Sequence, residues 1–207
     1  ATPFANVLIN PYIQHNKLDD LYPRDFITAL DLPDGYFGTE RLFGRDPDDA
    51  DLDESAGLDM IRIVPDADAK LLQPAKSKDR KTFYPEMPES LKDALLYFIG
   101  CCAARLYRGH TNAHMTMLVH TSIYTNLHDR VSDMIVAYLG KIKESGAMLK
   151  SEELLRLRGM WEDEGKRVPA SLFENTSSVA FDDLISFIPD VLNRLETPVE
   201  NSFSGER

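Results

Sequence analysis

The spacing of hydrophobic positions changes at Pro88, which divides the chain into two kinds of pattern. After this proline, apolar residues recur every three or four positions, at Leu91, Leu95, Phe98, Cys102 and Leu106. That spacing predicts a helix, with proline suited to its first turn and Gly109 at the point where it stops. The positions between the stripe residues are also largely apolar, so we expect this helix to be buried on most sides.

Three later stretches have the same helical period. They cover residues 127–142, 151–164 and 179–195, and the second opens with a Ser-Glu-Glu-Leu sequence that resembles a capping box. Pro189 lies inside the third stretch and is expected to kink or divide it. Helices therefore dominate the prediction.

Short apolar runs bounded by turn residues predict strands instead. Residues 26–30 lie between two prolines, residues 60–64 (Met-Ile-Arg-Ile-Val) end at a proline, and another strand is expected to begin at Val199. Residues 36–43 are expected to form a short helix. A further strand is predicted at residues 115–120. It is followed by a polar turn and the next helix, an order that resembles half of a βαβ unit. The predicted fold class is α+β, dominated by helices.

Composition and charge narrow the possible partners. The chain has 43% hydrophobic and 28% charged residues and a net charge of -11. An acidic surface disfavours broad capture of a phosphate backbone but leaves room for a local basic strip. Residues 46–54 form an acidic loop, and residues 76–81 (Lys-Ser-Lys-Asp-Arg-Lys) form a charged, exposed connector. These features are typical of a globular protein with no broad nucleic-acid surface.

The longest apolar run, residues 94–104, is too short to cross a bilayer. No signal-type segment opens the chain, so we expect a cytoplasmic protein with no membrane partner. Cys101 and Cys102 are neighbours in the long predicted helix, point in different directions, and are expected to be small buried groups rather than disulfide partners.

No motif for phosphate binding, nucleophilic catalysis or metal binding occurs. The chain has no G-x-x-x-x-G-K-[ST] or G-x-G-x-x-G loop, no G-x-S-x-G turn, and no cysteine pair or H-E-x-x-H spacing around its five histidines. We therefore expect no catalytic residue, no metal site and no cofactor in the chain itself.

Two sets of residues are candidates for contact with nucleic acid. Arg105 and Arg108 share the end of the long helix, and Ser122 lies in the turn before the next one. The alternative for the arginines is an ordinary solvated helix face. For a metal-dependent nuclease the candidates are carboxylates beside a lysine, namely Asp66, Asp68 and Lys70, with Glu40. The first three lie in one short segment, so a solvated acidic loop is the favoured interpretation.

Several phrases resemble known sequences. Residues 1–6 resemble the Thr-Ala-Thr-Pro motif that closes the first RecA-like domain of superfamily-two helicases. Residues 21–27, 36–44, 88–92 and 114–122 are similar to the Z-one (Z1) domain, a family of bacterial and phage endonucleases and helicase-like ATPases, some in restriction or phage defence. The family-motif positions are Arg24, Asp25, Phe26, Gly38, Glu40, His114 and His120. Ile123 stands where that family has an arginine.

The resemblance implies a place in a larger protein. Residues 1–9 would end a first RecA-like domain, residues 10–113 would be an insert, and residues 114–207 would open a second RecA-like domain with helical additions. The chain would be an accessory domain, noncatalytic in isolation, with DNA and the flanking motor domains as partners. ATP and Mg are expected for the parent protein. A metal-dependent endonuclease domain and a protein-interaction scaffold are the alternatives.

Overall fold

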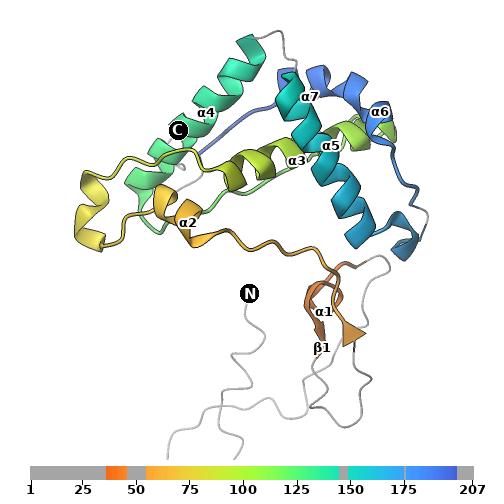
Figure 1. The fold of residues 1–207 in the computed structure, drawn as a ribbon, viewed down its shortest axis with the longest axis horizontal. Coiled ribbons are helices and arrows are strands. Elements are labelled where there is room, and N and C mark those ends of the chain that lie inside the picture. The colour runs from red at the N-terminus through yellow and green to blue at the C-terminus, as the bar shows by residue number, and fades with distance from the viewer. Residues whose placement is uncertain (1–35, 46–54, 145–148, 175, 200–207) are drawn as a thin grey trace, which may run out of the picture. The chain divides into compact units, whose positions relative to one another are not determined.

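The computed structural model describes residues 36–45, 55–144, 149–174 and 176–199 (Figure 1). They belong to two compact units, Ala1–Gly57 and Leu58–Arg207, and each is considered by itself. The strand predicted at residues 26–30, the acidic loop at 46–54, and the motif positions Arg24, Asp25 and Phe26 lie outside the described residues.

The first unit contains a short helix and a two-stranded pair. Helix α1 (Thr39–Phe43) leads into β1 (Gly44–Arg45), which pairs antiparallel with β2 (Ser55–Ala56). Gly44 ends the helix with a φ of 81°, a conformation that favours glycine. The predicted helix over residues 36–43 is therefore confirmed in its second half, which contains the motif residue Glu40.

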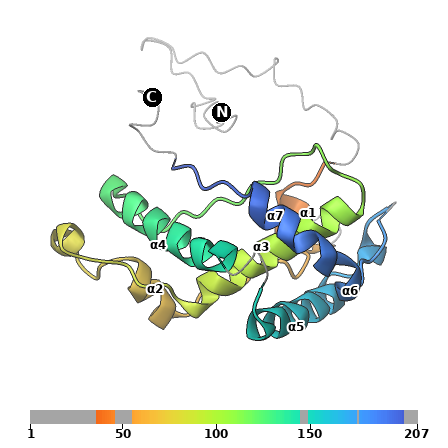
Figure 2. The same cartoon turned by 90° about the horizontal axis from the view of Figure 1, so that it is seen from above.

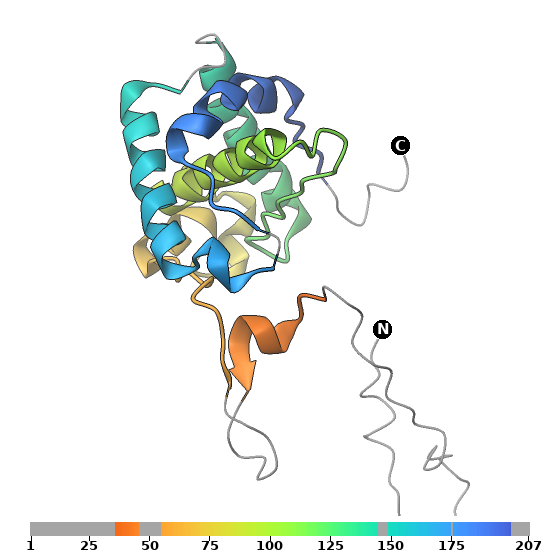
Figure 3. The ribbon, with the colours of Figure 1, turned by 90° about the vertical axis from the view of Figure 1, so that its right-hand side faces the viewer.

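Helix α3 (Glu89–Tyr107) is the centre of the second unit. Leu96 and Ile99 are at most 1% exposed, and Leu95 and Ala104, which are 6% and 2% exposed, lie nine positions apart and so on opposite sides of the helix. Helices α5 (Ser151–Arg167), α6 (Phe181–Leu184) and α7 (Ile188–Arg194) all pack against α3. Figures 1 and 3 show α5 at a steep angle to α3, and Figure 2 shows α7 crossing it. The predicted burial on most sides is confirmed. Burying one large aliphatic side chain contributes about 1.5–3 kcal/mol, so α3 supplies much of the stability.

Both ends of α3 are closed by specific hydrogen bonds. At its start, Asp68 Oδ2 accepts a bond from the Ser90 backbone N–H at 2.9 Å. At its end, Gly109 has a φ of 83° and its N–H donates to the Leu106 carbonyl, while the His110 N–H donates to the Arg105 carbonyl. This pair of bonds is a Schellman motif, which satisfies the last carbonyls of a helix. The start and stop predicted from sequence are confirmed.

The remaining helices follow the predicted order. Helices α4 (Thr125–Glu144) and α5 (Ser151–Arg167) match the second and third apolar stripes. Only the glutamate half of the expected capping box forms, with Glu153 accepting from the Lys150 N–H at 2.8 Å. The N-cap residue is Lys150, whose ammonium group has no acceptor for the return bond.

The last helical stretch is divided as Pro189 predicts. It consists of α6 (Phe181–Leu184), a 3-10 turn η4 (Ile185–Phe187) and α7 (Ile188–Arg194), with the proline in the first turn of α7. The smaller elements are α2 (Asp66–Leu72), η2 (Ser77–Lys81) and η3 (Ala170–Leu172). Among the described helices none combines the length and the apolar character that a membrane span requires.

The α+β fold class is wrong, because the expected RecA-like strand–helix portion is absent from the described part of the chain. Residues 60–64 and 115–120 have no strand structure, and neither has Val199. The only strand pair in the described ranges is β1–β2. A strand requires a neighbouring strand to complete its hydrogen bonds. Instead, Met115, Met117 and Val119 rest against the helical core. The fold is mostly helical.

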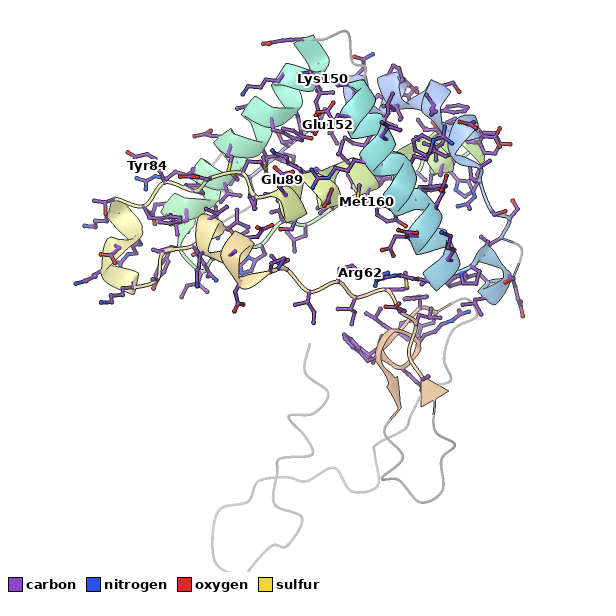
Figure 4. The ribbon with its side chains drawn as sticks, in the orientation of Figure 1. Arg62, Tyr84, Glu89, Lys150, Glu152 and Met160 are labelled. Atoms are coloured by element: carbon purple, nitrogen blue, oxygen red, sulfur yellow. The ribbon has the colours of Figure 1, made fainter. Side chains whose placement is uncertain are left out.

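Polar contacts fasten α5 to its neighbours. Arg156 on α5 pairs with Asp93 and Glu89 on α3, and Arg62 pairs with Glu164 on α5. Figure 4 labels Glu89 and Arg62. Hydrogen bonding to Arg156, and then to Lys92, lowers the pKa of the Glu89 carboxyl to about 2. Cys102 is buried, and both cysteines are free, as predicted. Burial raises the pKa of the Cys101 thiol to about 11.

Candidate functional site

A basic segment stands out from this acidic chain between α2 and α3. Residues 76–84 contain four basic side chains and one acidic one, whereas the whole chain carries a net charge of -11. Lys76, Lys78 and Lys81 are exposed on or beside the 3-10 helix η2. We define the basic edge as residues 76–84 together with residues 124–130, which are Tyr124 and the first six residues of α4.

Side chains of α4 fix the backbone of the basic segment. Asn126 Nδ2 donates to the Arg80 carbonyl at 2.9 Å, and Arg130 donates to the carbonyl of Lys81 at 2.9 Å and to that of Phe83. The Tyr124 hydroxyl also donates to Ser77 Oγ at 2.8 Å. The lysine side chains of the segment take no part in these bonds and are exposed to solvent.

Two arginines stack on two tyrosines along this edge. The Arg130 guanidinium lies 4.4 Å from the centroid of the Tyr84 ring, and that of Arg80 lies 5.1 Å from the Tyr124 ring. Tyr84 is nevertheless 74% exposed, and Figure 4 shows it on the loop between η2 and α3. Cationic groups alternating with aromatic rings are typical of surfaces that bind nucleic acid.

An open pocket of about 360 Å³ adjoins the edge at Tyr124. Its lining residues are Gln73, His120, Thr121, Ser122, Ile123 and Tyr124. Ser122 is buried, and its Oγ accepts from the Tyr124 N–H at 3.1 Å. The Ser122 carbonyl contacts His128 Nε2 at 2.6 Å, and the His128 ring lies 5.8 Å from that of His120. The pocket is open to solvent rather than enclosed, which is unlike a buried small-ligand site.

The structure separates the three residues predicted to contact nucleic acid. Arg105 and Arg108 lie at the C-terminal end of α3, where Arg108 donates to the Ser177 carbonyl at 2.7 Å. Ser122 lines the pocket together with Gln73, the residue that follows α2. Because Asp68 of α2 binds the N-terminal end of α3, Ser122 lies toward that end. Figures 1 and 2 show that the two ends lie on opposite sides of the unit. These residues do not form one site.

The structure also shows where the candidate nuclease residues lie. Asp66, Asp68 and Lys70 lie on α2, and Asp68 caps α3, which lowers the pKa of its carboxyl through hydrogen bonds from Ser90. Glu40 lies on α1 of the other unit. Within the described ranges, no three His, Cys, Asp or Glu side chains are grouped to hold a metal ion. Asp68 therefore has a structural role.

Sequence reasoning treated residues 76–81 as a solvated connector and missed the basic edge. The available signal was a basic run followed by Phe83 and Tyr84 in an otherwise acidic chain. Nothing local marks Arg130, because it is 47 residues away from the carbonyl of Phe83 that it binds. The pairing exists only after α4 has packed.

Comparison with protein families supplies an identity. The model of the Z1 domain matches residues 90–207, which is more than half of the chain. The chain belongs to the Z1 domain family. The match covers α3 to α7, and so includes residues 120–124 of the pocket and Arg130, but not η2. Searches of curated proteins and of solved structures give no significant match.

The resemblance noted in the sequence is thus supported for the second half of the chain. The phrase at residues 114–122 lies inside the matched range, and that at residues 88–92 begins two residues before it. Those at residues 1–6, 21–27 and 36–44 precede it. This Z1 domain has Ile123, 80% exposed, at the mouth of the pocket.

Proposed function

We propose that this Z1 domain is an accessory, noncatalytic domain of a larger ATP-dependent protein of the helicase or endonuclease type, and that it contacts DNA through the basic edge. ATP and Mg would be used by other parts of that protein. The observation that carries the proposal is the lysine-rich segment 76–84, held on α4 by Asn126, Tyr124 and Arg130.

The contact would be electrostatic and oriented. Each lysine that meets a phosphate releases condensed counterions, and this release supplies most of the binding free energy at low salt. The chain as a whole is acidic, with a net charge of -11, whereas residues 76–84 carry four basic side chains and one acidic one. Repulsion elsewhere would confine DNA to one edge, so that the domain positions the strand without reacting with it.

Salt titration tests the proposal. The 207-residue chain is titrated into fluorescently labelled DNA, and anisotropy gives the dissociation constant at several salt concentrations. Lys78→Ala with Lys81→Ala should reduce the slope of log K against log salt by about 0.7–0.9 for each lysine that meets a phosphate. Lys141→Ala with Lys166→Ala is the matched control, because both lysines are exposed and lie outside the basic edge, in the last turns of α4 and α5.

An unchanged slope in the first double variant would remove the basic edge from the site. A reduced slope in Arg105→Ala with Arg108→Ala would move the contact to the end of α3. Nicking of supercoiled plasmid by the purified chain with Mg²⁺ or Mn²⁺ would favour the endonuclease alternative. Absence of any DNA binding at low salt would favour the protein-interaction scaffold.

A further inference from the structure

We infer that the basic edge binds single-stranded rather than duplex nucleic acid, with one unpaired base stacked on the exposed face of Tyr84. This inference rests on the proposed function and specifies its substrate. It comes from the juxtaposition of an exposed tyrosine ring, an arginine behind that ring and lysines beside it, all on one edge.

The Tyr84 ring is a prepared stacking surface. Arg130 lies against one face of the ring at 4.4 Å from the centroid, yet 74% of the residue is exposed, so the opposite face is open to solvent. Arg130 is itself held by its bonds to the carbonyls of Lys81 and Phe83. Because the backing group is fixed, little side-chain entropy remains to be lost when a base stacks on the ring.

Tyr84 has no comparable role in holding the fold together. The hydrophobic core and the partly buried residues packed against it do not include Tyr84. By contrast, the Tyr97 ring lies 6.0 Å from the Trp161 ring, and the Tyr107 ring meets Phe187 edge to face. An exposed aromatic ring backed by a fixed cation is better explained by a ligand with a flat face than by internal packing.

The neighbouring charges suit a phosphate chain that passes the ring. Lys81 is three residues before Tyr84, which is at most about 10 Å along the backbone. Lys78 and Lys76 continue in the same direction on and beside η2. A nucleotide stacked on Tyr84 would therefore place its adjacent phosphates near lysines, as in proteins that bind single strands with alternating rings and cations.

A duplex could meet the lysines with its phosphates, but it could not use the Tyr84 ring. Its bases stack on each other, so their faces are not available to a side chain. Recognition of a duplex through its major groove commonly uses a helix or a two-stranded ribbon, whereas the lysines of the edge lie on or beside the five-residue helix η2. The observed geometry therefore favours an unpaired strand.

The decisive comparison uses three labelled oligonucleotides of equal length: a single strand, its duplex, and a single strand whose central nucleotides are abasic. The single strand should bind about tenfold more tightly than the abasic strand, since stacking one base on an aromatic side chain contributes that order of affinity. It should also bind more tightly than the duplex. A 2-aminopurine base in the single strand should lose fluorescence on binding.

Tyr84→Leu should abolish both the preference and the quenching and leave the salt slope unchanged, whereas Tyr84→Trp should retain them. Tyr36→Leu is the control, since Tyr36 is 56% exposed and is not part of the basic edge. Thermal melts verify that each variant folds. Equal affinity for the abasic and intact strands would overturn the inference, while a slope reduced by the lysine variants would still support the proposed function. If no oligonucleotide binds, both fail.

Discussion

Helix α3 and the basic edge are built on opposite principles. The helix is held by apolar contacts on several sides, with Leu96 and Ile99 essentially inaccessible to water. The edge is held by a few polar bonds from α4 to the carbonyls of a short, exposed segment. A net hydrogen bond contributes about 0.5–1.5 kcal/mol, less than one buried leucine. The core determines whether the domain folds, whereas the edge can change its chemistry while the fold remains.

The largest loss of stability should come from creating a cavity in the core by shortening a buried side chain of α3. Leu96 is 1% exposed, so Leu96→Ala should lower the free energy of unfolding by about 2–5 kcal/mol. Leu155→Ala on α5 removes the same atoms from a residue that is 71% exposed and should change it by less than about 0.5 kcal/mol. Urea denaturation measures both. Equal losses would mean that the contrast between core and surface is wrong.

A smaller loss is expected where α4 meets the basic segment. Arg130→Met removes the bonds to the carbonyls of Lys81 and Phe83 and should cost about 1–3 kcal/mol, because these bonds involve a charged donor. Amide hydrogen exchange of residues 77–84 should accelerate while that of α3 changes less. The control is Arg194→Met, whose arginine is 59% exposed and pairs with Asp190 on the same helix. Unchanged exchange in the segment would show that Arg130 does not fix it.

Two glycine substitutions should have opposite signs. Gly109 ends α3 with a φ of 83°, so Gly109→Ala should destabilise the domain by about 1 kcal/mol. Gly159 lies inside α5, and a Cβ there would meet nothing within 4 Å, so Gly159→Ala should stabilise it by up to about 1 kcal/mol. Thermal melts distinguish the two. A gain from Gly109→Ala would contradict the Schellman ending.

The smallest effect is a dependence of stability on pH at the junction of α3 and α5. Bonding to Arg156 lowers the pKa of Glu89 to about 2, from an ordinary value of 4.5. A lowered pKa means that the stabilisation is complete above about pH 4.5 and is lost as the pH falls toward 2. Glu89 is 59% exposed, so solvent screening keeps the effect small. Glu89→Gln should flatten the pH dependence of the melting temperature in this window, and an unchanged profile would exclude the pair as its cause.

Local periodicity was sufficient to predict much of this fold. The stripe from Leu91 to Leu106 places α3, Gly109 ends it, and Pro189 divides the last helical stretch, because each of these signals acts within a few residues. The strand predicted at residues 115–120 was wrong, because local periodicity does not show whether a pairing strand is present. Every second residue of this segment, Met115, Met117 and Val119, packs against the core as in a strand. No described segment pairs with residues 115–120, so no strand forms.

The sequence by itself determined α3, α4, α5 and the divided last helical stretch, their order, and the positive charge of residues 76–81. Its interpretation of Asp66, Asp68 and Lys70 as part of a loop was wrong, because they lie on α2. Only the tertiary structure decided that the charge of residues 76–81 forms an edge with Tyr84 and Arg130, and that Arg105 and Arg108 lie apart from Ser122. Helix formation depends on neighbours three or four positions away, which a sequence displays directly. A site assembled by bonds across 46 to 49 residues depends on how α4 packs, and no local pattern records that packing.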